Sequence, residues 1–173
     1  MRSYKVEGII LKRSNFSEAD KIITLFTKQL GKIKVLAKGV RRIKSRRAPH
    51  LELFNHVELV LHTGKTFDTI TEAKIIDDYS MLKQQLKLSG LLFYLCEVID
   101  KILPEHQPHP ELFEIFLKSL PNLNQDKVKK FVVELLWNLG YLPKGEYPKL
   151  GITQFVENIV EKRIRSKKFL EEI

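Results

Sequence analysis

Cysteine and long apolar runs are scarce in this sequence of 173 residues. Its single cysteine, Cys96, lies in the apolar stretch LLFYLCEVI, so an intrachain disulfide is excluded and a buried, unreactive thiol is expected. No apolar run reaches the length of a membrane span, and the opening MRSYKVEGIILKR lacks the apolar core of a signal peptide. These absences predict a soluble cytoplasmic protein without a membrane partner.

Negative charge is also scarce over one long stretch. No acidic residue lies between Asp20 and Glu52, and the net charge of the chain is +9. Residues 1–78 hold 16 Lys and Arg against 9 Asp and Glu, whereas residues 79–173 hold 14 against 12. Such an excess of one sign indicates a polyanionic partner, which is nucleic acid or, less often, an anionic membrane.

Sequence patterns for catalysis and for metal or cofactor binding are missing as well. The GKT of residues 64–66 ends like a phosphate-binding loop, but the motif needs glycine where Leu59 stands. His106 and His109 are flanked by prolines that forbid a regular helix, and no cysteine or carboxylate cluster joins them. No Ser/His/Asp or Cys/His arrangement is recognisable, and a two-metal nuclease would need more acids. We therefore expect no enzyme, no metal ion and no cofactor.

The hydrophobic residues of the first 78 positions follow a period of two in places, which predicts strands. The expected strands cover 3–13, 20–28, 31–40, 53–62 and 66–76. Five short strands in so short a segment indicate a small barrel, either an SH3-like barrel or an OB-fold. The OB-fold is a five-stranded barrel that commonly binds oligonucleotides.

Beyond residue 78 the apolar residues recur with helical spacing. One helix runs from about Leu88 to Ile102 and is stopped by Pro104, and the EHQPHP that follows is predicted to be a linker. Further helices are expected over 112–120, 126–139 and 152–160. The predicted class is α+β, with an N-terminal OB-fold barrel over residues 1–78 and a C-terminal helical bundle over residues 79–173.

The strongest functional signal is AKGVRRIKSRR, residues 37–47, which carries six cations and no anion. In the strand before it, apolar residues share one face and lysines share the other. Lysines two apart project roughly 6.5 Å from each other, which resembles the spacing of phosphates along an extended strand. We predict that these cations follow a nucleic-acid backbone without reading its sequence. The predicted nucleic-acid-binding residues are Lys32, Lys34, Lys38, Arg41, Arg42, Lys44, Arg46 and Arg47.

Two other interpretations of this run stay open. It could be a mobile, solvated loop, although six like charges repel one another and no neighbour in the sequence neutralises them. It could contact a membrane, although it lacks the amphipathic helical pattern that inserts an apolar face. Gly39, Ser45 and Pro49 favour a shaped loop over a helix. The turn SEAD, residues 17–20, offers a carboxylate that could orient an arginine.

A second basic cluster lies near the end of the sequence. Its cations either suit the C-terminus of a helix or make a second contact with phosphate. Its members are Lys162, Arg163, Arg165, Lys167 and Lys168. Among the aromatic residues, Phe16 in a polar loop is the best candidate for stacking on a base, whereas the strand parity of Tyr4 places it in the core.

The segment EGIILKRSNFSEADKIITLFTKQLGKIKVLAKGVRRIKSR closely resembles the N-terminal region of RecO, a family of bacterial DNA repair proteins. The shared features are Gly-Ile-Ile-Leu, a Glu-x-Asp pair before a strand, Phe-Thr, Leu-Gly-Lys, Ala-Lys-Gly-Val-Arg-Arg and Lys-Ser-Arg. Weaker similarity returns at FVVELLWNLGYLP and at RSKKFL. The resemblance is strong for about residues 6–60 and patchy but collinear up to residue 170.

The resemblance implies an N-terminal OB-fold and a C-terminal helical domain. It implies binding of single- and double-stranded DNA, annealing of complementary strands, and help in loading RecA onto strands coated by single-stranded-DNA-binding protein. It implies RecR as a partner and a location at the nucleoid. The basic strand and loop match the family's DNA-binding barrel at Lys32, Lys34, Lys38, Arg41, Arg42, Lys44 and Arg46.

The sequence departs from the family in one place. Many members carry a four-cysteine zinc module after the Gly-Tyr-x-Pro segment, but only KGEYPKLG separates Pro143 from the last helix here. We expect this module to be missing.

The helical half is close to neutral and is expected to serve protein partners. We expect a groove between its helices to hold an extended acidic and apolar peptide, with Lys127, Lys129 and Lys130 as acid-reading groups, and the resemblance implies that this peptide is the tail of single-stranded-DNA-binding protein. An RNA-binding OB-fold protein without a role in recombination fits the same charge pattern and stays the alternative.

Overall fold

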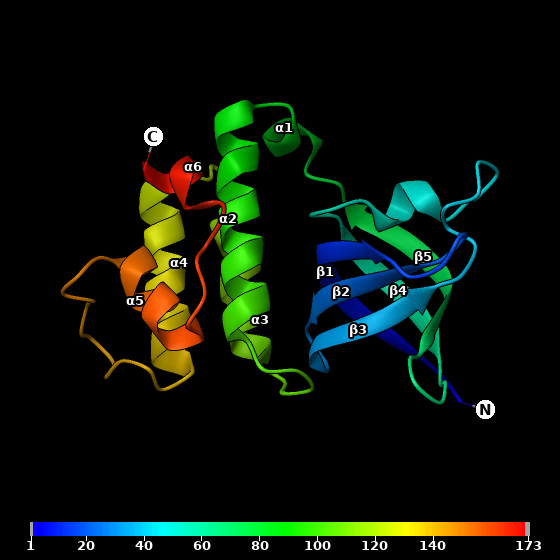
Figure 1. Cartoon of the computed structure of the whole chain (residues 1–173), viewed down its shortest axis with the longest axis horizontal. Helices are drawn as coiled ribbons and strands as arrows, with labels where there is room; N and C mark the ends of the chain where they lie inside the picture. Colours follow the sequence, from blue (N-terminus) through cyan, green and yellow to red (C-terminus); the bar gives the residue numbers. More distant parts are fainter. Residues whose placement is uncertain (1, 172–173) are drawn as a thin grey trace. The chain divides into compact units, whose positions relative to one another are not determined.

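The computed structural model describes residues 2–171 of the chain (Figure 1). The chain forms two compact units, of which the first comprises Met1–Tyr79 with Pro104–Pro110 and the second comprises Ser80–Leu103 with Glu111–Ile173. The first unit is a β-barrel and the second is helical, so the predicted α+β class is confirmed. The barrel unit also takes up a short segment from between two helices, which the sequence did not indicate.

The barrel consists of five strands in the order β1-β2-β3-β5-β4. The strands are β1 (Ser3–Asn15), β2 (Lys21–Thr27), β3 (Gly31–Ala37), β4 (His56–His62) and β5 (Thr69–Asp77). Neighbouring strands are antiparallel, except that β3 and β5 run parallel and pair only through Leu36 and Thr69. This is the five-stranded barrel of the OB-fold that the sequence predicted.

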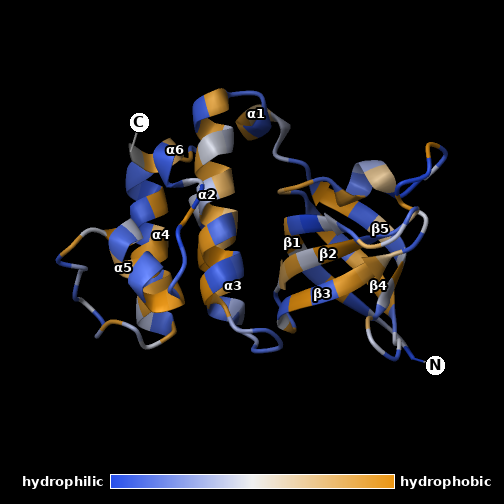
Figure 2. Ribbon diagram, viewed as in Figure 1, coloured by the Kyte–Doolittle hydropathy of each residue, from blue (hydrophilic) through white to orange (hydrophobic). Residues whose placement is uncertain are grey.

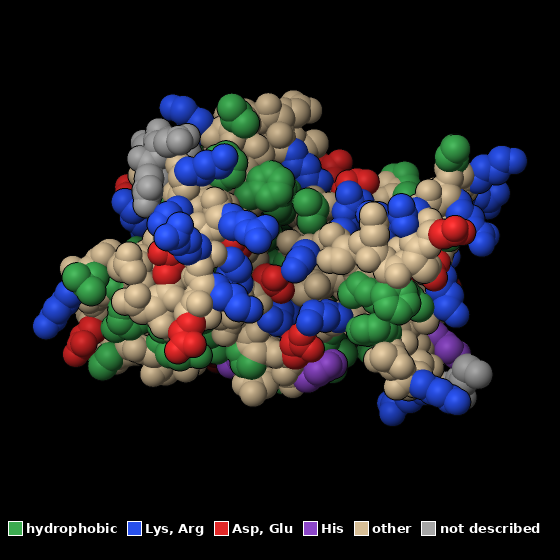
Figure 3. Space-filling view, in the orientation of Figure 1, with side chains coloured by type: hydrophobic (Ala, Val, Ile, Leu, Met, Phe, Trp, Pro, Cys, Tyr) green, Lys and Arg blue, Asp and Glu red, His purple; other side chains and the backbone are tan. Residues whose placement is uncertain are grey.

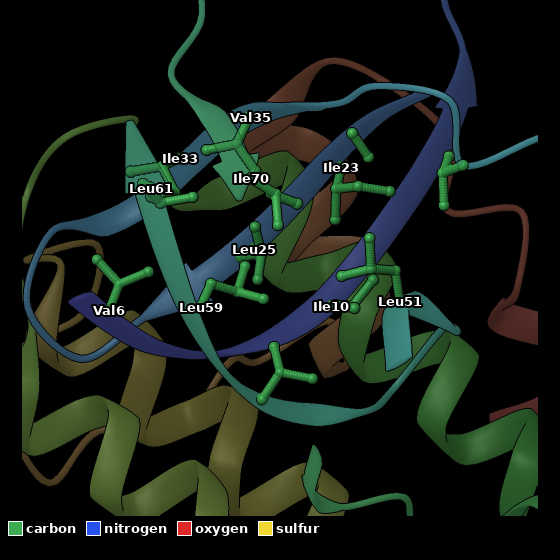
Figure 4. Packing of buried hydrophobic residues seen from close by; sticks show 13 residues of the cluster. Val6, Ile10, Ile23, Leu25, Ile33, Val35, Leu51, Leu59, Leu61 and Ile70 are labelled. Atoms are coloured by element: carbon green, nitrogen blue, oxygen red, sulfur yellow. The ribbon is translucent and has the colours of Figure 1, made fainter. Parts of the chain in front are cut away.

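Alternate side chains of the strands fill the barrel, as the period of two requires. Ile33, Val35 and Ala37 of β3 all point inward and are at most 2% exposed. Figure 4 shows Ile33 and Val35 beside Ile70 of β5 in the same interior. Leu51, from the short 3-10 helix η1 (Ala48–Leu51), joins this core. Figure 2 shows the corresponding apolar stretches along the strands and mostly polar residues in their connections. Each fully buried side chain of this size stabilises the fold by about 1.5–3 kcal/mol.

Several strand bounds differ from the prediction, and at two of them, the end of β3 and the start of β4, the backbone turns. β3 ends at Ala37 rather than at residue 40, since Gly39 turns the chain with a φ of 68°. β4 begins at His56 rather than at residue 53, since Phe54 has a φ of 70°. The basic run is therefore confined to a connection between two turns.

The segment Pro104–Pro110, which we call the strap, runs beside the first half of β3. The backbone N–H of His106 donates to the carbonyl oxygen of Lys32 at 2.9 Å, and Glu105 forms a parallel bridge with the same residue. Glu105 Oε1 also lies 2.6 Å from Nζ of Lys34. The strap thus supplies hydrogen bonds to a part of β3 that β5 does not reach, which an exposed strand edge needs. The prediction of a plain linker missed this pairing, because it involves the backbone of a distant strand.

The helical unit contains the four predicted helices and two short additional ones. The helices are α1 (Ser80–Lys83), α2 (Leu86–Ile102), α3 (Pro110–Ser119), α4 (Gln125–Asn138), α5 (Ile152–Val160) and α6 (Lys167–Glu171). Asn124 caps the N-terminus of α4, since its side chain accepts a hydrogen bond from the backbone N–H of Lys127 at 3.0 Å. Phe116 of α3 and Phe131 of α4 are fully buried, with ring centroids 5.1 Å apart.

A carboxylate of α2 holds the segment that leads into α6. Glu97 accepts hydrogen bonds from the backbone N–H groups of Arg165 and Ser166, both at 2.8 Å, and from the Ser166 hydroxyl. The Lys101 ammonium donates to Glu97 at 2.6 Å and to the carbonyl oxygen of Arg163 at 2.7 Å. Burial raises the pKa of Glu97, but the hydrogen bonds outweigh it and lower the pKa to about 2, against an ordinary value of 4.5.

Two glycines at the ends of β3 allow a test of the strap. Gly31 has a φ of 71°, and a Cβ on it would lie 2.0 Å from the carbonyl oxygen of Gln107 in the strap. Gly39 has a φ of 68°, but a Cβ there would meet nothing closer than Arg42 Cδ at 3.8 Å. Both alanine variants should lose about 1–2 kcal/mol because of the left-handed backbone. Gly31→Ala should lose more, since the strap must also move.

Urea unfolding of the two glycine variants measures this difference. Equal free energies of unfolding for Gly31→Ala and Gly39→Ala would show that the strap does not stabilise the barrel.

The low pKa of Glu97 predicts a pH dependence of stability. A carboxyl group whose pKa is lower in the folded state stabilises the fold above its ordinary pKa, and this stabilisation is lost as the pH falls from 4.5 toward 2. Glu97→Gln should therefore unfold more easily than the wild type near neutral pH, and the difference should shrink at about pH 3. Glu111→Gln, an exposed change in the same unit, serves as the control. A deficit of Glu97→Gln that stays constant with pH would contradict the role of its charge.

Candidate nucleic-acid interface

Residues 38–47, which we call the basic connection, follow β3 as a series of turns. Gly39 reverses the chain, and the N–H of Arg42 then donates to the carbonyl oxygen of Gly39 at 3.1 Å. The N–H of Ser45 donates to the carbonyl oxygen of Arg42 at 3.0 Å. The connection is therefore a shaped loop, as its Gly, Ser and Pro content predicted.

Asp20, at the end of the β1–β2 connection, anchors this loop. Its Oδ1 accepts a hydrogen bond from the N–H of Gly39 at 2.8 Å. This bond, a hydrogen bond from Ser17 and the charges of Lys38 and Arg42 lower the pKa of Asp20. The sequence predicted that a carboxylate of residues 17–20 would orient an arginine. In the structure the hydrogen bond of Asp20 goes instead to the backbone of Gly39.

Two of the predicted cations are bound to the barrel by hydrogen bonds. The Arg41 guanidinium donates to the carbonyl oxygen of Ser17, and its backbone N–H donates to that of Ala19 at 3.0 Å. The Arg47 guanidinium donates to the carbonyl oxygens of Ile70 and Lys38, at 2.6 and 2.9 Å. Both side chains hold the basic connection in place, so they are less available to a ligand than the others.

Four further cations of the basic connection point into solvent. They are Lys38, Arg42, Lys44 and Arg46. Within residues 2–171, none of these four side chains makes a hydrogen bond or an ion pair. Ile43 lies between two of them and is fully exposed. This arrangement presents exposed positive charge on a loop whose backbone is held by hydrogen bonds.

The two lysines in the first half of β3 have a different environment from the one predicted. Lys32 is only 8% exposed, and its backbone pairs with the strap. Lys34 is half-exposed, but its ammonium is paired with Glu105. The row of lysines expected along this face is therefore interrupted, and the exposed charge is concentrated in the basic connection. The strap interrupts the row of lysines, and the sequence did not predict the strap.

Two aromatic residues from separate connections meet on the barrel. Phe16, in the β1–β2 connection, is 56% exposed, and its ring centroid lies 5.9 Å from that of Phe67 in the β4–β5 connection, edge to face. These two connections flank the oligonucleotide-binding face in OB-folds. The sequence indicated Phe16 for stacking but could not reveal its contact with Phe67. Tyr4 packs against the barrel core, as expected, and donates to Asp68.

The space-filling view shows how charge and aromatic surface are distributed. On the barrel face seen in Figure 3, Lys and Arg side chains flank a group of hydrophobic side chains, with some Asp, Glu and His side chains nearby, and further Lys and Arg side chains lie on the projecting loop between β3 and η1. Cations around exposed aromatic rings are the combination that single-stranded nucleic acid requires.

The second basic cluster lies in the helical unit, after α5. The helix ends at Val160 without a cation in its last turn, and Glu161 leaves it with a φ of 52°. Lys162 and Arg163 follow the end of α5, and Lys168 lies in the last turn of α6, so the interpretation that the cluster suits a helix C-terminus stays open. Lys167 lies 3.6 Å from Glu157, and the Lys168 ammonium lies over the Phe169 ring. The other three cations, Lys162, Arg163 and Arg165, are exposed.

Among residues 2–171, no group of three or more His, Cys, Asp or Glu side chains is placed to hold a metal ion. No helix in this part of the chain is long and apolar enough to cross a membrane.

Comparison with known proteins gives consistent similarity along the chain. Residues 1–79 match the family model "Recombination protein O N terminal", and residues 83–147 match "Recombination protein O C terminal". The "DNA repair protein RecO" of Symbiobacterium thermophilum is 34% identical over 149 residues, covering 83% of this chain and 59% of that protein. The protein of the same name from Dehalococcoides mccartyi is 36% identical over 146 residues, covering 82% and 58%. The chain therefore spans less than two thirds of the length of these curated relatives. The two family models between them match most of the chain, in the expected order, and on this basis the chain belongs to the RecO family.

Proposed function

We propose that this protein acts in DNA repair and homologous recombination as a DNA-binding protein rather than as an enzyme. The observation that carries the proposal is the basic connection, in which Lys38, Arg42, Lys44 and Arg46 face solvent while hydrogen bonds fix the backbone between them. Phosphates bound there release counterions, and no base needs to be read. Membership in the RecO family supports DNA as the polyanion.

The same charges suit both single and double strands, because they contact the backbone that both share. Two complementary strands repel each other through their phosphates, and cations that screen this repulsion favour pairing. We infer that the protein anneals complementary strands in this way, with no chemical step. The exposed cations of the second basic cluster, Lys162, Arg163 and Arg165, offer a further contact for phosphate.

The partners follow from the family and belong to the same proposal. They are RecR, single-stranded-DNA-binding protein and, indirectly, RecA, which the protein would help to load onto coated single strands at the nucleoid. An RNA-binding role is the alternative, because phosphates are common to both nucleic acids. Competition between DNA and RNA strands of the same sequence distinguishes the two, and stronger displacement by RNA would favour the alternative.

The helical unit contains a pocket that supports a proposal for the peptide partner. A pocket of about 380 Å³ is lined by apolar and aromatic side chains, including Val133 and Trp137, and by two lysines and two carboxylates, Lys129, Lys130, Asp126 and Glu134. The Trp137 indole donates to the carbonyl oxygen of Glu146 at 2.8 Å, which fixes one wall. We infer that this pocket binds the acidic and apolar tail of single-stranded-DNA-binding protein. Of the three lysines predicted to read acids, Lys127 instead donates to the carbonyl oxygen of Pro121.

The salt dependence of DNA binding tests the role of the basic connection. If its four solvent-facing cations meet phosphates, log K should fall with log salt at a slope of about −3 on single strands. Changing Arg42, Lys44 and Arg46 together to Ala should flatten this slope by about 2 and slow annealing, with little change in stability. Arg41 and Arg47 are kept, because they hold the loop.

The matched control for this experiment changes three exposed cations elsewhere on the barrel, Lys5, Lys12 and Lys74, to Ala. It should retain most of the slope and of the annealing rate. If the loop variant folds and behaves like the control, the basic connection is only a solvated surface.

The peptide site is tested with an acidic, apolar tail peptide and the fluorescence of Trp137. Exchanging Lys129 and Lys130 for Glu should weaken peptide binding by about tenfold or more, because attraction to the acidic residues becomes repulsion. Lys144→Glu, an exposed change of the same kind outside the pocket, should bind nearly as the wild type. Equal affinities of the two variants would place the peptide elsewhere.

A further inference from the structure

The barrel unit contains a small pocket beside the Phe16–Phe67 pair. Its volume is about 250 Å³, and it opens between the middle of β3, the β4–β5 connection and the strap. Its lining includes the rings of Tyr4 and Phe67 and the polar side chains of Lys34, Asp68 and Glu105. The phosphate contacts proposed for the basic connection do not involve the lining of this pocket. We propose that it binds one unstacked nucleobase of a single-stranded DNA.

The charges of the pocket favour a base over a phosphate. Two carboxylates, Asp68 and Glu105, line it, and the only lysine, Lys34, is already paired with Glu105. A phosphate would meet net negative charge there. A base is neutral, and its edge offers N–H donors to carboxylates and carbonyl oxygens to an ammonium group.

The pocket also has the shape and rigidity that a base requires. Its volume is below the range of sites for drug-sized ligands, which suits a single ring system. Asp68 fixes the β4–β5 connection, since its carboxylate accepts from the Tyr4 hydroxyl and from the N–H of Gly64 at 3.0 Å. Phe16 supports Phe67 edge to face, so the Phe67 ring is held in place at the pocket. A base–aromatic contact of this kind is sequence-tolerant, because every base has a π-face.

The pocket is connected to the basic connection through the β1–β2 connection. Phe16 contacts Phe67 of the pocket, while Ser17 and Ala19 accept hydrogen bonds from Arg41. Residues 16–19 thus link the two features, and we infer that one strand contacts both. This inference rests on the proposed DNA binding and adds a separate, base-dependent contact to it.

The test compares two single strands of equal length and charge, one of thymidines and one of abasic sites. Wild-type protein should bind the abasic strand about tenfold more weakly, because the phosphate contacts remain and the base contact is lost. Phe67→Ala removes the aromatic wall, and Thr66→Met narrows the pocket from an exposed position. Both should bring the ratio of the two affinities close to one while leaving the salt dependence unchanged. Lys65→Met, on the same loop but outside the pocket, should keep the wild-type ratio.

A direct readout comes from 5-iodouracil placed along the strand and crosslinked by light. Crosslinks to Tyr4 or Phe67 would support the pocket. Wild-type ratios in both pocket variants, or crosslinks confined to residues outside the pocket, would overturn the base site and leave the phosphate site standing. If neither strand binds at all, the proposed DNA binding fails, and the base site fails with it.

Discussion

The hydrogen bond between Asp20 and the backbone of Gly39 is the constraint on which the candidate interface depends. A loop with six like charges tends to expand, because each cation gains by moving away from the others. Asp20 is the last acid before Glu52, and it lies where the chain leaves β3. Asp20 fixes the first turn of the loop through a backbone hydrogen bond and not through a cationic side chain. The exposed cations therefore stay close together and available to a ligand.

The helical unit uses the same arrangement in a different setting. Glu97 accepts two backbone N–H groups beside Arg165, much as Asp20 accepts one beside Lys38. In each case a carboxylate stabilises backbone within a basic cluster by accepting its N–H groups. Two of the 21 acids of this basic protein thus order backbone within basic clusters.

The fold could be predicted further than the site. The alternation of Ile33, Val35 and Ala37 sufficed for β3, and Pro104 marked the end of α2. The density of cations pointed to the basic connection, but it could not distinguish Arg47, which binds carbonyl oxygens of the barrel, from the exposed Arg46. Backbone carbonyls are present at every residue, so they leave no sequence pattern. The strap and the Phe16–Phe67 contact were missed for a similar reason, since residues far apart in the chain form them.

The strap also bears on how the protein is made. The chain completes five strands, passes through all of α2, and only then contributes Pro104–Pro110 to the barrel unit. During synthesis on the ribosome, roughly thirty residues are added after the end of β5 before the strap, the partner of the β3 edge, emerges. This takes seconds at about 5–20 residues per second. In that interval the growing chain presents an open strand edge, so translation speed and chaperones that cover such edges should influence the yield of folded protein.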